Sequence, residues 1–274
     1  MPIRWTHLLK RIALALLLLL LVLVLLLVGF IVGDGLLNEG PAAVANVRYP
    51  AADGSELLGY LAEPAGDGPH PAVLLIHEIW GLDDGMVVLA DALAEEGYLV
   101  FAPDLFRGEG ATMLPRGLWL RLTTPGQQIT ADADSSLAYL RDLPQADTRR
   151  IAAMGFCFGG GQSLQLGLRQ PENLTTIVIY YGSLVTDPDR LRPLAQAQPV
   201  LGIFGEDDQQ IGPEEVRSFE AALNELAIEN EIIIYPEVGH AFLNEENYDE
   251  PGAAGAAWLQ TLAFLERNLK GGGR

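Results

Sequence analysis

The sequence predicts an α/β fold, with helices on both faces of a mostly parallel sheet, preceded by one transmembrane helix. Short apolar segments typical of buried strands alternate along the chain with amphipathic segments typical of helices. Such alternation favours a parallel sheet, because each crossover between parallel strands usually carries a helix. A glycine-rich turn at residues 155–161 joins one such strand to a helix, and residues 12–33 form an apolar run.

The apolar run is long enough to cross a bilayer. A helix over residues 12–33 would span about 33 Å, close to the hydrocarbon thickness, whereas a signal-peptide core is usually about 7–15 residues long. We therefore expect an uncleaved signal anchor that follows a basic N-terminal segment, residues 1–11. Residues 34–45, rich in Gly, Pro and Ala, are expected to form a flexible linker. The alternative is a cleaved signal, which would leave a secreted protein.

The charges that flank the run predict its orientation. Arg4, Lys10 and Arg11 precede it, whereas Asp34 and Glu39 follow it. Positive charge stays on the cytoplasmic side of a membrane, so the N-terminus is expected inside. The domain that follows would then lie on the periplasmic or extracellular side.

Composition excludes several classes of function. The net charge is −19, and the first 33 residues hold three basic side chains and no acid, so the rest of the chain carries −22. Such an acidic domain argues against binding to nucleic acid or to anionic lipid. Cys157 is the only cysteine, which rules out an internal disulfide or a cysteine-based metal site. His77-Glu78 begins like the zinc-protease motif HExxH, but position 81 is Gly, and we expect neither a metal nor a cofactor.

Residues 46–270 are expected to form one domain, because no repeat or second boundary is visible. Predicted strands cover residues 47–50, 56–61, 71–77, 98–102, 150–154, 176–180, 199–204 and 231–235. The first two form a hairpin across Asp53-Gly54. Predicted helices run from a cap at Asp83 or Asp84 to Glu96, and over 130–143, 162–169, 213–226 and 253–269. In such sheets, ligands bind beyond the carboxyl ends of the strands.

The glycine-rich turn has the layout of a nucleophile elbow, with Cys157 at its apex. The turn strains the central residue, and Gly155 and Gly159 supply the small neighbours that it needs. Cys157 would start a helix, where the helix dipole favours the reactive thiolate. The alternative is a small buried hydrophobic residue, which is the commonest role of a lone cysteine.

Two further strand ends carry the residue types that a thiol nucleophile requires. Gly205-Glu206-Asp207-Asp208 follows one strand, and His240 follows the last strand. The order is nucleophile, acid, histidine, as in α/β-hydrolases. The backbone N–H groups of Phe158 and Ile79 are the candidate oxyanion donors. Taken singly, each of these residues also has an ordinary interpretation as part of a solvated loop.

Glu78 is unusual because a carboxylate at the end of a buried strand is costly unless it is paired or functional. Proximity to Cys157 would let it influence the protonation of the thiol. The structural alternative is an ion pair, for example with Arg107.

Several motifs together resemble the dienelactone hydrolase family. They are Gly155-Phe156-Cys157-Phe158-Gly159-Gly160, His77-Glu78-Ile79-Trp80-Gly81, Ala102-Pro103-Asp104-Leu105, Gly205-Glu206-Asp207-Asp208 and Gly239-His240-Ala241-Phe242. The resemblance covers about residues 46–268. It implies a small α/β-hydrolase domain with Cys157 as nucleophile, His240 as base, Asp208 as orienting acid, and Glu78 as a group that helps to deprotonate the thiol.

The departures from the family concern substrate and location. The family's substrate-binding arginine follows the Pro-Asp-Leu stretch, and Arg107 is offset from that place. The loop 109–128, which includes Arg121, is either a lid or a surface excursion. Candidate substrate contacts are Arg107, Trp80, Tyr181 and Phe242.

The expected function is a hydrolase for carboxylic ester or lactone bonds, with a small-molecule ester or lactone as its substrate. The alternative is a non-catalytic, membrane-anchored module that binds a ligand or a partner protein on the same fold. No feature of the sequence decides the oligomeric state.

Overall fold

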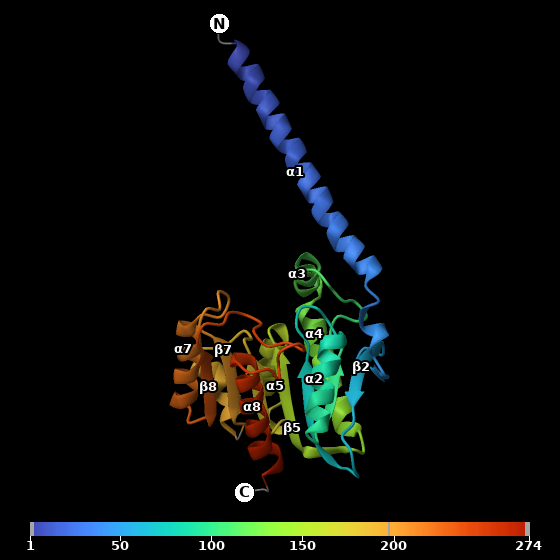
Figure 1. The fold of residues 1–274 in the computed structure, drawn as a ribbon, viewed down its shortest axis with the longest axis vertical. Coiled ribbons are helices and arrows are strands. Elements are labelled where there is room, and N and C mark those ends of the chain that lie inside the picture. The colour runs from blue at the N-terminus through green and yellow to red at the C-terminus, as the bar shows by residue number, and fades with distance from the viewer. Residues whose placement is uncertain (1–2, 197, 272–274) are drawn as a thin grey trace.

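The computed structural model describes residues 3–196 and 198–271. A long helix, α1 (Ile3–Leu37), stands out from an α/β domain (Figure 1). It extends beyond both ends of the predicted span 12–33, and among the described residues it is the one helix long and apolar enough to cross a membrane. A signal sequence would meet the same criterion. The first two residues of the basic segment 1–11, and residue 197 of the domain, lie outside the described residues.

Eight strands of the described chain form one sheet, in the order β1-β2-β4-β3-β5-β6-β7-β8. The strands are β1 (Val47–Pro50), β2 (Glu56–Ala62), β3 (His70–Ile76), β4 (Leu99–Pro103), β5 (Ala146–Phe156), β6 (Thr176–Tyr180), β7 (Val200–Gly205) and β8 (Asn230–Tyr235). β2 pairs antiparallel with both β1 and β4, and every other pair is parallel. The predicted fold class is therefore confirmed, and the ends of the parallel strands meet at one edge.

Helices cover both faces of the sheet. They are α2 (Asp84–Glu95), α3 (Leu114–Thr123), α4 (Gly126–Asp142), α5 (Phe158–Arg169), α6 (Pro188–Leu191), α7 (Pro213–Glu225) and α8 (Ala253–Leu265). Apolar side chains of α2 and α8 share one core cluster with the sheet, whereas those of α4, α5 and α7 pack into two clusters on the other face (Figure 1). Asp83 caps α2 by accepting a hydrogen bond from Met86 N at 3.0 Å, as one of the two predicted caps.

Three differences between the structure and the sequence prediction bear on the site and on α1. α5 begins at Phe158 rather than at 162, because the glycines after Cys157 are helical and buried against the sheet. The loop 109–128 contains a helix of its own, α3, and the first residues of α4. The predicted linker 34–45 is not a free tether: α1 continues to Leu37, a 3-10 helix covers Gly40–Ala43, and the buried Asp34 carboxylate bonds to the start of α3.

Candidate active site

The turn between β5 and α5 holds Cys157 in a strained conformation. Its φ is 51° and its ψ is −111°, and its N–H donates to Tyr180 O at 2.9 Å. A Cβ at Gly155 would lie 2.3 Å from the carbonyl carbon of Gly159, and a Cβ at Gly159 would lie 2.0 Å from Ile76 O. Only glycine fits at these two positions, because the backbones of β5, α5 and β3 approach within contact distance there.

Cys157, His240 and Asp208 form a hydrogen-bonded chain. His240 Nε2 lies 3.1 Å from Cys157 Sγ, and His240 Nδ1 lies 2.8 Å from Asp208 Oδ2. The three residues come from the ends of β5, β7 and β8, which are 32 to 83 residues apart in sequence. The geometry gives the thiol a base within proton-transfer distance and gives the imidazole a fixed orientation.

Asp208 is held more firmly than its neighbour Asp207. Its Oδ1 accepts from Gln210 N at 2.7 Å and from Ile211 N at 3.0 Å, and the residue is 4 % exposed. The side chain of Asp207 is exposed. Of the two candidate acids, the structure brings Asp208 to the histidine.

Burial opposes the thiolate that the helix N-terminus was expected to favour at Cys157. Burial, followed by the negative charge of Glu78, raises the pKa of Cys157 to about 12. The N–H of Phe158 and the charge of Arg121 act in the opposite direction but are smaller effects. The helix N-terminus does not overcome desolvation here, because the sulfur lies in a largely enclosed site.

Glu78 lies beside this thiol with few hydrogen-bond donors. Trp80 Nε1 donates to Glu78 Oε2 at 3.1 Å, and within the described residues the buried Oε1 has no partner. Burial, and then the charge of Asp83, raises the pKa of Glu78 to about 7, with Glu245 adding a smaller contribution. The carboxyl group therefore exchanges its proton near neutral pH.

Arg107 takes no part in this cluster. Its Nε donates to Asp132 Oδ2 at 2.7 Å and its Nη2 donates to Asp53 Oδ2 at 2.9 Å, so Arg107 is paired with these two carboxylates rather than with Glu78, and it does not line the cavity at the thiol. Arg107 is placed elsewhere because it neutralises Asp132, which is fully buried on α4. The sequence prediction of Arg107 as a substrate contact has no support in its position.

A cavity of about 440 Å³ opens at the thiol. Besides the predicted residues Glu78, Ile79, Trp80, Tyr181 and His240, its walls include residues that sequence reasoning missed: Leu114, Leu118, Arg121, Ser183, Gln210 and Ile211. Three of these share one face of α3, at spacings of four and three residues, which is the signal that could have found them. Arg121 lies over the Phe158 ring, 5.3 Å from its centroid, and is the cation of this cavity among the described residues.

Of the two other predicted contacts, Phe242 and Tyr181, one lies outside the cavity and one lines it. Phe242 packs against Tyr181 and Tyr235, with ring centroids 5.7 and 5.6 Å apart, rather than lining the cavity. Tyr181 lines the cavity, but its hydroxyl donates to Leu243 O at 2.9 Å. The described residues hold no group of three or more metal-ligating side chains close enough for a metal ion.

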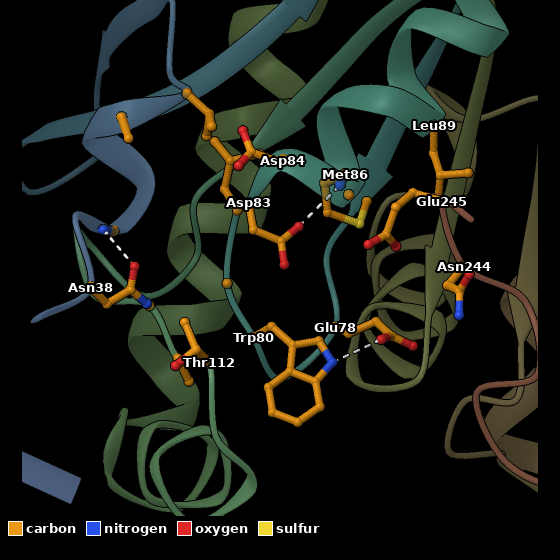
Figure 2. Close-up of a pocket in the computed structure, with 18 of the residues that line it drawn as sticks. Asn38, Glu78, Trp80, Asp83, Asp84, Met86, Leu89, Thr112, Asn244 and Glu245 are labelled. Atoms are coloured by element: carbon orange, nitrogen blue, oxygen red, sulfur yellow. Dashed lines mark hydrogen bonds between the residues drawn. The ribbon is translucent and has the colours of Figure 1, made fainter. Parts of the chain in front are cut away.

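A second cavity, of about 660 Å³, lies on the other side of Glu78 and Trp80. Figure 2 shows Glu78 among the residues that line this cavity, together with the carboxylates of Asp83 and Glu245. Glu78 and Trp80 therefore form a partition between an acidic cavity and the cavity that holds the thiol.

The sequence model of the dienelactone hydrolase family matches residues 57–269 of this chain. The chain belongs to that family. A relative from Escherichia coli, provisionally named a carboxymethylenebutenolidase, is 32% identical over 243 residues, which cover 82% of this chain and 88% of the relative. Family membership makes the protein a hydrolase of carboxylic esters or lactones.

Solved structures agree with this assignment. The crystal structure of a provisionally named dienelactone hydrolase from Klebsiella pneumoniae is 28% identical in sequence to this chain and superposes on it with a TM-score of 0.69. The match covers 81% of this chain and 100% of the Klebsiella chain. An esterase from Thermogutta terrifontis shares the fold alone, at 19% identity and a TM-score of 0.65, over 81% of this chain and 93% of its own.

Proposed function

We propose that the protein hydrolyses esters or lactones through an acyl-enzyme formed on Cys157, with His240 as base and Asp208 as orienting acid. The observation that carries the proposal is the chain of short contacts from Sγ through the imidazole to a buried carboxylate. That arrangement is the one by which a histidine activates a nucleophile that is inert at its own pKa.

In the first half-reaction, His240 Nε2 takes the thiol proton as Sγ attacks the carbonyl carbon. The carbonyl oxygen becomes an oxyanion, and the N–H groups of Phe158 and Ile79 are its proposed donors. The C–O bond to the alcohol then breaks, and the imidazolium returns its proton to the leaving oxygen. Water, deprotonated by His240, cleaves the thioester and releases the carboxylic acid.

Glu78 controls when the thiol ionises. Its charge raises the thiol pKa, so a buried carboxylate at this position keeps Cys157 protonated and unreactive in the empty site. A substrate that fills the cavity changes the surroundings of both groups, and Glu78 then helps to remove the thiol proton. This dependence on substrate would protect the only cysteine from oxidation on the extracytoplasmic side.

The apolar segment of α1 is proposed to be an uncleaved anchor, with the N-terminus in the cytoplasm and the catalytic domain outside it. Its length, its continuous apolar surface and the basic residues before it support this topology. External protease should release the domain from intact cells, whereas a shortened soluble chain would indicate a cleaved signal.

The catalytic proposal is tested by hydrolysis of short aryl esters and unsaturated lactones by the full chain in detergent. Cys157→Ala should abolish turnover, and the parent enzyme should accumulate a thioester that mass spectrometry places on Cys157. Equal rates for the parent and Cys157→Ala would refute the nucleophile and leave ligand binding as the function of the site.

A further inference from the structure

Helix α3 is fastened to the C-terminal end of α1. Asp34 Oδ2 accepts from Thr112 N at 3.0 Å and from Met113 N at 3.3 Å, and the Thr112 hydroxyl donates to the same carboxylate. Arg116 packs its guanidinium against Gly35, where a Cβ would lie 2.5 Å from Cζ. α3 therefore has a fixed place relative to α1.

That place is level with the end of the apolar segment. Asp34 follows directly on the apolar run 12–33, and Arg116 Nη1 reaches Ile31 O, within the run, at 3.5 Å. If α1 spans a bilayer, the first turn of α3 lies where hydrocarbon gives way to headgroups. In Figure 1, α3 sits at the end of the domain from which α1 departs, and it is seen nearly along its axis while α1 runs across the picture. α3 therefore lies crosswise to α1, close to the plane of the membrane.

The surface that α3 turns away from the domain is apolar. Trp119 is 49% exposed and Leu122 is 79% exposed, and Leu36 and Leu37 at the end of α1 are exposed large hydrophobic side chains as well. α3 contains two arginines and no acid, although the domain as a whole is strongly acidic. An exposed surface of aromatic and aliphatic side chains, on a helix with no acidic residue, is typical of helices that lie in the membrane interface.

The adjacent side of the same helix forms the mouth of the thiol cavity. Leu114 and Leu118 line the cavity and are also 55% and 46% exposed, so they stand at its rim. Gly117 fits against Ile79 O, and Leu120 is buried in the core, so α3 is packed on the domain rather than loose. The short α3 thus separates the cavity from the level at which the membrane begins.

We infer that α3 docks on the lipid bilayer through Trp119 and Leu122, and that the active site takes amphiphilic esters or lactones from the membrane rather than from water. The occupant of this apolar surface is lipid, because α3 is fastened to α1 at the level where the apolar run of α1 ends. A substrate with an apolar chain would enter the cavity past Leu114 and Leu118, with its ester group reaching the thiol first and its chain towards the membrane. The inference rests on the proposed anchor and on the proposed catalytic site.

Depth in the bilayer is measured on the full chain, reconstituted in phosphatidylcholine vesicles. Cys157→Ala removes the only cysteine, and Leu122→Cys or Leu259→Cys then accepts a single NBD label. Leu259 is the matched control, since it is 67% exposed on α8, away from α3. We expect lipids with brominated acyl chains to quench the label at 122 at least threefold more strongly than the label at 259. Equal quenching at the two sites would overturn the inference. Energy transfer between the labels at position 122 of two chains, without quenching by lipid, would also overturn it, because the surface would then be a dimer interface.

Substrate access is measured by comparing two esters in the same vesicles. Leu122→Glu should lower kcat/KM for p-nitrophenyl laurate, which partitions into lipid, about tenfold, because a charge in the interface lifts α3 away from it. The same variant should leave p-nitrophenyl acetate hydrolysis unchanged, and Leu259→Glu should alter neither rate. An equal rate of laurate hydrolysis by Leu122→Glu and the parent would overturn the inference, and so would a parallel loss with both esters.

Failure of the catalytic proposal is recognised separately. It would show as acetate hydrolysis that survives Cys157→Ala, a result that the quenching measurement does not depend on. Failure of the anchor would show as full-length chain that stays with the aqueous phase during reconstitution.

Discussion

Two carboxylates flank the thiol, and they are built differently. Asp208 accepts from two backbone N–H groups and from His240, so each of its oxygens has a donor. Glu78 accepts from Trp80 alone, and its Oε1 has no partner among the described residues. Both side chains lie at the carboxyl ends of strands in the same sheet. The difference between them is the number of donors that the surrounding chain supplies.

The contrast separates two uses of a buried acid. A carboxylate with a donor for each oxygen is held in one place and can orient a base, as the triad acid of other hydrolases does. A carboxylate with one donor, near Asp83 and Glu245, has its pKa raised to about 7 and can gain or lose a proton during turnover. Four substitutions test this contrast, in order of expected effect.

The largest effect is expected for Asp208→Asn. Without the carboxylate, His240 loses its orientation and its imidazolium loses a counter-charge, so kcat for a short aryl ester should fall about 10³- to 10⁴-fold. Steady-state kinetics check this. Asp207→Asn is the control, since that side chain is exposed, and its kcat should stay within about twofold of the parent. A larger loss at Asp207 would move the acid role to that residue.

The next effect concerns stability and pH. In the folded protein Glu78 has a pKa of about 7 against an ordinary 4.5, so the folded state holds its proton more tightly than the unfolded state. Its destabilising contribution is absent below pH 4.5, grows as pH rises and is complete above 7. Glu78→Gln removes this destabilising contribution. The increase in the free energy of unfolding that it causes should therefore be about 2–3 kcal/mol larger at pH 8 than at pH 4.5. Denaturant titration at the two pH values measures this, and a difference independent of pH would contradict the raised pKa.

Glu78→Gln should also make the thiol more reactive. At pH 8 Glu78 is ionised, and removing its charge lowers the pKa of Cys157, so alkylation by iodoacetamide should accelerate up to about tenfold. Intact-mass kinetics provide the rate. The ratio of variant to parent should approach one below pH 6, where Glu78 already carries its proton. Slower alkylation in the variant at pH 8 would mean that Glu78 acts on the thiol as a base even in the empty site.

The smallest effect is expected for Trp80→Phe, which removes the single donor to Glu78. The carboxyl group should then ionise at still higher pH, and stability at pH 8 should fall by about 1 kcal/mol. A double-mutant cycle with Glu78→Gln isolates the contact from the lost indole surface. No coupling between the two substitutions would show that the indole does not support the carboxylate.

Local pattern was sufficient to predict much of the site. The elbow could be read from Gly155 and Gly159 around Cys157 because the required conformation depends on immediate neighbours. The positions of Asp208 and His240 followed from strand order, since parallel strands deliver their carboxyl ends to one edge. Family resemblance then chose Asp208 over Asp207, and the structure brings that residue to the histidine.

Only the tertiary structure decided what surrounds these residues. Arg107 lies near the site in sequence yet pairs with Asp132 on α4, whereas Arg121 reaches the cavity from α3. The attachment of Asp34 to the start of α3 spans 78 residues and carries no local pattern. The sequence by itself determined the fold class, the apolar segment and the turn at Cys157, because these depend on periodicity and backbone sterics. The protonation of Cys157 and Glu78 was decided by the folded structure, because a pKa depends on burial and on charges that sequence distance does not reveal.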